Sequence, residues 1–238
     1  MTTAATDRPN ASARKAPTRP RRALGDHVAA TVGKLQAQVL HEPPVPEAVG
    51  AIARLRRCIG RIPGADYTLG TYLSVPDELL RGRPRTETDA YDAEYAVHDA
   101  ITLYALHQQS RRERMHVSGS GLGVALAALV RKSVSPEGVR RRFAALGTAT
   151  SYAESIHHLR GLVTMLREHQ IPVDYGLLAD DLYTLRQPAG QPPGRPSGRA
   201  TVQAVWGREF FRTRPTAGDT NDSGNPSDSA TETEERAQ

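Results

Sequence analysis

The chain has 238 residues, a hydrophobic content of 38% and a formal net charge of +5 at pH 7. Its single cysteine, Cys58, excludes an internal disulfide framework, and no apolar run approaches the ~20 residues that a membrane-spanning helix needs. Only 5% of the residues are aromatic, which favours a helical core of Leu, Val and Ala over a β-sandwich. The N-terminus lacks the apolar segment of a secretory signal. We therefore expect a soluble, cytoplasmic protein without a membrane anchor.

The two ends of the chain differ in composition from its middle. The N-terminal end is basic and rich in Pro, Ala and Thr, whereas the C-terminal end is acidic and rich in Ser, Thr, Gly and Asn. Neither end contains enough apolar residues to offset the entropy that ordering would cost. We predict a disordered basic tail over 1–22, one mildly basic helical domain over 23–212 and a disordered acidic tail over 213–238.

Between the tails, apolar residues recur every three or four positions, which is the pattern of helices buried on one side. No stretch shows the period of two that is typical of a half-buried strand. The fold class is therefore predicted to be all-α, a single-domain multi-helix bundle. The helices and helical turns expected in chain order are 23–40, 46–59, 67–73, 76–80, 89–109, 122–132, 136–147, 151–169, 175–185 and 200–212.

Several details of these helices follow from local chemistry. Val49 falls on the apolar stripe of the second helix and is expected to be buried. Ser135 and Asp174 directly precede helices and are expected to cap their N-termini, because short polar side chains accept hydrogen bonds from the first free N–H groups. Gly147 is expected to end its helix in a left-handed conformation.

Sequence motifs for catalysis, cofactors or metals are weak. The segment "GSGLG" at 119–123 has the spacing of neither a dinucleotide-binding nor a P-loop motif, and no strand is predicted before it. His157 and His158 are adjacent, so they point about 100° apart on a helix and do not easily share a metal ion. Asp180 and Asp181 are interpreted as surface and capping charges. We expect no catalytic residue, no metal and no cofactor.

Arginines are grouped on most of the predicted helices. In "GVRRRFAALG" at 138–147, Arg140, Arg141 and Arg142 point in three directions about 100° apart. Arg141 faces away from the apolar stripe, Arg140 flanks it, and Arg142 is the most structural of the three. Charge alone leaves two interpretations open, namely solvated helix faces or contacts to nucleic-acid phosphates, which the planar guanidinium group suits.

Five segments in a fixed order, together with "IARLRR" near residue 55, resemble the CasB family, the small subunit of the type I-E CRISPR surveillance complex Cascade. They are "SGLGVALAAL", "VRRRFAAL", "HHLRGLVTML", "IPVDYGLLADDL" and "VQAVWGREFF". The resemblance covers about residues 45–212, and this chain departs from the family at its tails and at the Pro/Gly-rich insertion 187–199. It implies an all-helical, non-catalytic protein present in two copies that contacts the backbone and large subunits of Cascade. It also implies a basic surface that binds guide RNA and target DNA and stabilises the R-loop.

The resemblance assigns nucleic-acid contacts position by position, to the basic pair in "LRR", the pair before an apolar helix and the arginine in "HHLR". Two further cations at the end of a helix are added from charge alone. The predicted nucleic-acid-binding residues are Arg56, Arg57, Arg131, Lys132, Arg140, Arg141 and Arg160. Two alternatives stay open: a purely structural helical scaffold without nucleic-acid contact, and a helical DNA-binding regulator, although no helix–turn–helix spacing is clear.

Overall fold

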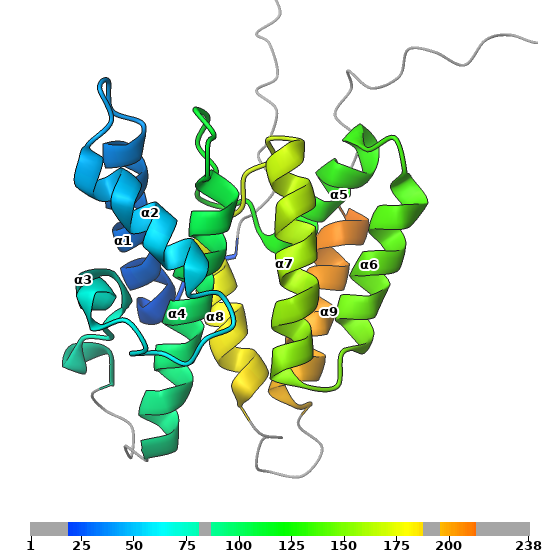
Figure 1. The fold of residues 1–238 in the computed structure, drawn as a ribbon. Coiled ribbons are helices and arrows are strands. Elements are labelled where there is room, and N and C mark those ends of the chain that lie inside the picture. The colour runs from blue at the N-terminus through cyan, green and yellow to red at the C-terminus, as the bar shows by residue number, and fades with distance from the viewer. Residues whose placement is uncertain (1–18, 81–86, 188–195, 213–238) are drawn as a thin grey trace, which may run out of the picture.

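A computed structural model of the chain describes residues 19–80, 87–187 and 196–212. This part of the chain folds into nine α-helices and two 3₁₀ turns and contains no strand, which confirms the all-α prediction (Figure 1). The helices are α1 (Ala23–Val39), α2 (Pro46–Arg57), α3 (Gly70–Leu73), α4 (Glu87–Gln108), α5 (Leu122–Lys132), α6 (Pro136–Thr148), α7 (Tyr152–Glu168), α8 (Tyr175–Arg186) and α9 (Gly198–Arg212). The 3₁₀ turns are η1 (Tyr67–Leu69) and η2 (Asp77–Leu80).

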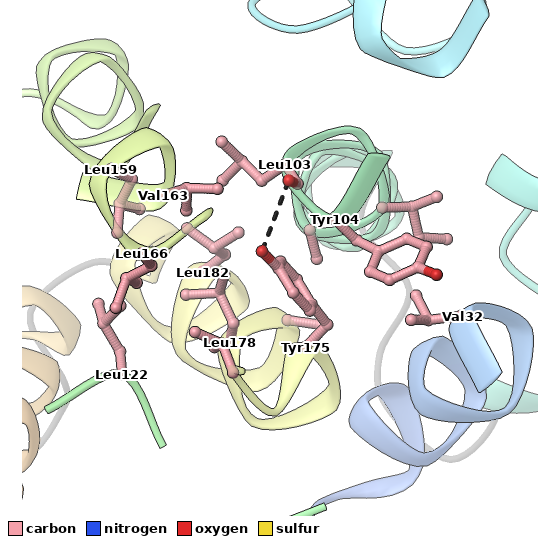
Figure 2. Close-up of a cluster of buried hydrophobic side chains, with 14 of the residues drawn as sticks. Val32, Leu103, Tyr104, Leu122, Leu159, Val163, Leu166, Tyr175, Leu178 and Leu182 are labelled. Carbon is pink, nitrogen blue, oxygen red and sulfur yellow. Dashed lines mark hydrogen bonds between the residues drawn. The ribbon is translucent and has the colours of Figure 1, made fainter. Parts of the chain in front are cut away.

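Helix α8 runs through the middle of the bundle. Helices α1 to α4 lie on one side of it, and α5, α6, α7 and α9 lie on the other (Figure 1). Nine of the twelve residues of α8 are buried, because α1, α4 and α9 all pack against it. In Figure 2, Leu178 and Leu182 of α8 lie among Leu159 and Val163 of α7 and Leu103 of α4. One hydrophobic core therefore joins the two sides of the molecule.

Local rules account for the helices that flank this core. The Ser151 side chain caps α7 by accepting a hydrogen bond from the Glu154 backbone N–H at 3.1 Å. Asp174 caps α8, because its Oδ1 accepts hydrogen bonds from the N–H groups of Gly176 at 3.0 Å and Leu177 at 3.2 Å. The predicted Asp174 cap is thus confirmed, and each cap satisfies donors that have no partner inside the helix.

Three local predictions are wrong. The Val49 side chain is 48% exposed, because Ala48 and its neighbours one turn further on occupy the buried side of α2. Ser135 stands at the N-cap of α6, but its side chain makes no cap hydrogen bond. Gly147 lies inside α6, which continues to Thr148, and it does not take a positive φ. Two of these errors concern the ends of α6, and the third concerns which side of α2 is buried.

Asp180 is buried, contrary to the prediction of a surface charge, and only 2% of it is exposed. Its Oδ2 accepts a hydrogen bond from the Arg22 backbone N–H at 2.7 Å, and its Oδ1 accepts one from the Gly25 N–H at 2.9 Å. The carboxylate thereby caps the start of α1 from another helix. Burial raises the pKa of Asp180 to about 6, although the two backbone donors oppose this rise.

Asp181 is also buried, and it binds the segment that precedes α1. Its Oδ1 and Oδ2 accept hydrogen bonds from Arg19 Nη1 at 2.5 Å and Nη2 at 2.8 Å, and Oδ2 accepts a third from Trp206 Nε1 at 2.8 Å. Residues 19–22 therefore pack on the bundle, in contrast to the predicted disordered tail that extends to residue 22. Residues 1–18 and 213–238, and most of the insertion, lie outside the described residues.

Candidate nucleic-acid interface

All seven predicted contact residues lie at the surface of the bundle. Six are exposed and one, Arg56, is half-buried. Within the described residues, the side chains of Arg57, Arg141 and Arg160 form no ion pair with a carboxylate. Their positive charges are therefore available to an anionic partner.

The last turn of α2 carries three arginines, where their charge complements the negative end of the helix dipole. They have different roles. Arg54 Nη1 donates a hydrogen bond to Thr68 Oγ1 at 3.1 Å and so holds the 3₁₀ turn η1 against α2. Arg57 Nε donates to the Ala53 carbonyl at 3.2 Å, within its own helix, and the residue stays exposed. Arg57 thus remains exposed at this helix end, whereas Arg56 is half-buried.

Arg160 lies next to the loop that follows α2. Together with Ile59, Gly60 and Arg61 of that loop, it lines a groove between the α2 loop and α7, to which α4 also contributes. The tertiary fold thus places Arg160 in one groove with Arg61, about a hundred residues earlier in the chain. Arg61 was missed by the sequence analysis, because it stands alone in a turn and nothing in its local sequence connects it to α7.

A second basic region surrounds the turn between α5 and α6. Arg131 and Lys132 occupy the last turn of α5. Only residues 133–135 separate them from α6, whose first two turns carry Arg140 and Arg141. The structure therefore brings these four predicted residues into two consecutive helices joined by a short turn, and these helices do not line the groove between the α2 loop and α7.

The three consecutive arginines of α6 behave differently from one another. Arg140 Nε lies 3.4 Å from Glu137 Oε1, an exposed pair one turn apart that contributes little to stability. Arg142 is exposed, and its Nη1 donates to the Gly138 carbonyl at 3.4 Å, within its own helix. Arg141 is exposed and has neither restraint. Its guanidinium group is therefore the least restrained of the three.

An apolar pocket of about 310 Å³ lies between α6 and α9 beside Arg140. Phe143, Trp206 and Phe210 contribute to its wall, and Phe211 lies at its edge with 79% of its surface exposed. An exposed aromatic side chain beside an apolar hollow is typical of a surface that contacts protein.

The backbone N–H groups of the glycine segment at the start of α5 form hydrogen bonds within the protein. The Gly123 N–H donates to Glu209 Oε2 at 3.1 Å, and the Gly119 N–H donates to Asp174 Oδ2 at 2.7 Å. Carboxylates of the protein itself thus take donors that a phosphate would need. Within the described residues, no group of three potential metal ligands is close enough to bind an ion, and no helix is long and apolar enough to cross a membrane.

Comparison with known proteins agrees with this architecture. Residues 51–211 match the family model described as CRISPR-associated protein Cse2. The crystal structure of CasB from Thermobifida fusca is 38% identical with a TM-score of 0.65, and the match covers 80% of this chain and 99% of that chain. A CRISPR-associated protein of the Cse2 family from Thermus thermophilus is 25% identical with a TM-score of 0.55, covering 79% of this chain and 98% of that chain.

A structure of CasB from Thermus thermophilus, at 24% identity and a TM-score of 0.53 over 79% of this chain and 98% of that chain, shares the fold. No curated protein sequence matches the chain. The family model covers most of the bundle, and the Thermobifida fusca structure is similar over nearly its whole length. The chain therefore belongs to the CasB (Cse2) family, the small subunit of the CRISPR surveillance complex Cascade.

Proposed function

We propose that this chain is a non-catalytic subunit of a type I-E Cascade that binds guide RNA and target DNA through their phosphates and stabilises the R-loop. The observation that carries the proposal is the set of exposed guanidinium groups on α2, α6 and α7 without carboxylate partners in the described residues. Arginine suits this task, because its planar fork matches the geometry of phosphate oxygens.

The energetics of an R-loop favour such a subunit. The RNA–DNA duplex that forms is about as stable as the DNA duplex that is lost, so a few protein–phosphate contacts are enough to shift the balance. Phosphate contacts carry no sequence information of their own. A surface that binds only the backbone therefore leaves target selection to the guide RNA.

The salt dependence of binding by the full-length protein tests the proposal. Each phosphate contact contributes about 0.7 to the slope of log K against log salt for single strands and about 0.9 for duplexes. Replacing Arg57, Arg140, Arg141 and Arg160 by alanine should therefore weaken binding to both RNA and DNA and make the slope shallower by about 3. Filter binding at several salt concentrations measures both quantities.

A matched control removes the same charge elsewhere on the surface. Its four alanine substitutions replace the exposed residues Arg22, Lys34, Arg112 and Arg208. The control should keep most of the affinity and slope of the wild type. Equal losses in both quadruple variants, with both folded by circular dichroism, would contradict the proposed surface. A wild-type slope near zero would favour the scaffold alternative, in which the apolar pocket beside Arg140 serves contacts with other subunits.

A further inference from the structure

The groove between the α2 loop and α7 is lined by exposed cations, by aromatic and apolar side chains and by one carboxylate. Its volume is about 250 Å³, which is the space of several water molecules and is sufficient for one nucleobase. The exposed cations Arg61 and Arg160 line it, and so does the exposed ring of His157. Its remaining lining residues are Ile59, Gly60, Tyr95, Asp99, Tyr152, Ala153 and Ile156.

The aromatic part of the groove is held in place from behind. The rings of Tyr95 and Tyr152 meet edge to face at 6.3 Å between centroids. The Arg186 guanidinium carbon lies 4.3 Å from the centre of the Tyr95 ring and 4.7 Å from that of Tyr152. Arg186 is in turn anchored by Asp92, whose Oδ1 accepts from Arg186 Nε at 2.6 Å. The two rings therefore form a wall that does not need to reorganise when a ligand enters.

One carboxylate faces this apolar space. Asp99 is only 3% exposed, and its Oδ2 accepts a hydrogen bond from the Tyr152 hydroxyl at 2.8 Å. Its Oδ1 lies 3.0 Å from His98 Nδ1. Each carboxylate oxygen can accept two hydrogen bonds, so capacity remains for a further donor. A buried carboxylate repels a phosphate group but accepts a hydrogen bond from an amino group.

We propose that this groove holds one unstacked base of a single-stranded nucleic acid, with the flanking phosphates at Arg61 and Arg160. This inference rests on the proposed function, and it adds a base-binding subsite to a surface otherwise assigned to phosphates. The distribution of charge decides how the nucleotide is oriented. Its phosphates lie outside, at the exposed cations, and its base points inward, towards the buried carboxylate. Asp99 favours bases with an exocyclic amino group, as carboxylates do when they accept from cytosine N4. Cytosine or adenine therefore fits better than thymine or uracil.

Fluorescence anisotropy of the full-length protein with three labelled strands of equal length tests the inference. The strands are oligodeoxycytidine, oligodeoxythymidine and an abasic sugar-phosphate strand, which all present the same number of phosphates. Insertion of a base is worth about fivefold or more in affinity, as base–aromatic contacts are elsewhere. We expect oligodeoxycytidine to bind most tightly and the abasic strand most weakly.

Two variants of the groove sharpen the test. Ala153→Trp fills the groove from an exposed position on α7 and should reduce oligodeoxycytidine binding to the level of the abasic strand while the salt slope is kept. Ala30→Trp, at an exposed position on α1, is the matched control and should change nothing. Asp99→Asn replaces one acceptor by a donor and should abolish the preference for cytidine over thymidine, which provides an independent readout if Ala153→Trp does not fold.

The outcomes separate the inference from the proposed function. If wild type binds all three strands equally, with a steep salt slope, the base subsite is refuted and phosphate binding stands. The same conclusion follows if Ala153→Trp leaves the ratio of cytidine to abasic binding unchanged. If no strand binds at any salt concentration, the proposed function fails and the base subsite fails with it.

Discussion

Replacement of Arg19 by alanine tests whether the segment before α1 is a structural part of the bundle. Arg19 and Asp181 form a bidentate ion pair. The aspartate side chain is 3% exposed and the arginine side chain is 27% exposed. Removing the arginine leaves a buried carboxylate with Trp206 Nε1 as its remaining strong donor. Burial already raises the pKa of Asp181, and Arg19 opposes this rise.

The expected magnitude follows from this burial. Removing one partner of a fully buried ion pair costs about 3–5 kcal/mol, because the other charge is left without compensation. Water already reaches part of Arg19, so about 2–4 kcal/mol is expected here. For a domain of this size, such a loss corresponds to a decrease of roughly 5–15 °C in Tm. Urea unfolding of the full-length chain at pH 7, followed by circular dichroism, measures the free energy directly.

Arg22→Ala is the matched control for this experiment. The Arg22 side chain is exposed, and its contact with Asp180 uses the backbone N–H, which the substitution keeps. The control should lose less than about 1 kcal/mol, because removing an exposed charge has little effect on stability. If Arg19→Ala loses no more stability than Arg22→Ala, the Arg19–Asp181 ion pair does not stabilise the bundle, and its proposed role in compensating the buried carboxylate is refuted.

Two further predictions concern packing and pH. Gly123→Ala should destabilise the fold by about 2 kcal/mol or more in urea unfolding, because the new Cβ would overlap with the Trp206 carbonyl oxygen. Its control is Gly161→Ala, where the new Cβ meets open space, and this variant should be more stable than wild type by up to about 1 kcal/mol. Burial lowers the pKa of His107 from its usual value near 6.5 to about 3. Below pH 6.5 the unfolded chain protonates this histidine and the folded chain does not, so the stability that the neutral His107 contributes is present above pH 6.5 and is lost as pH falls towards 3. Between pH 7 and pH 5 the free energy of unfolding of His107→Leu should therefore decrease by about 2 kcal/mol less than that of wild type. An equal loss in wild type and variant would refute this.

Helix positions were largely predictable because they depend on neighbours in the chain. The predicted helix 151–169 corresponds to α7, and its apolar residues at helical spacing, from Ile156 to Leu166, form the buried side. The Asp174 cap follows from the position of a short acidic side chain directly before an apolar run. The order of five short segments was also enough to indicate the family.

The candidate site could be predicted only in part. Charge and resemblance selected cations that all lie at the surface, but they gave no information on which cations lie together. Arg160 and Arg61 line the same groove because α2 and α7 both pack against α4, and Asp99 of α4 faces that groove. Contacts between residues so far apart in the chain leave no periodic pattern in the sequence.

Asp180 and Asp181 show most clearly what the local sequence pattern cannot predict. Two adjacent residues on a helix point about 100° apart, so a helix with one buried face exposes at least one of them. The local pattern of residues is sufficient to make α8 a helix, and with one buried face it predicts at least one of the two aspartates at the surface. It is the packing of the whole chain that surrounds α8 with α1, α4 and α9 and places two backbone N–H groups and Arg19 where the carboxylates need partners. Burial and its compensation are properties of several chain segments at once.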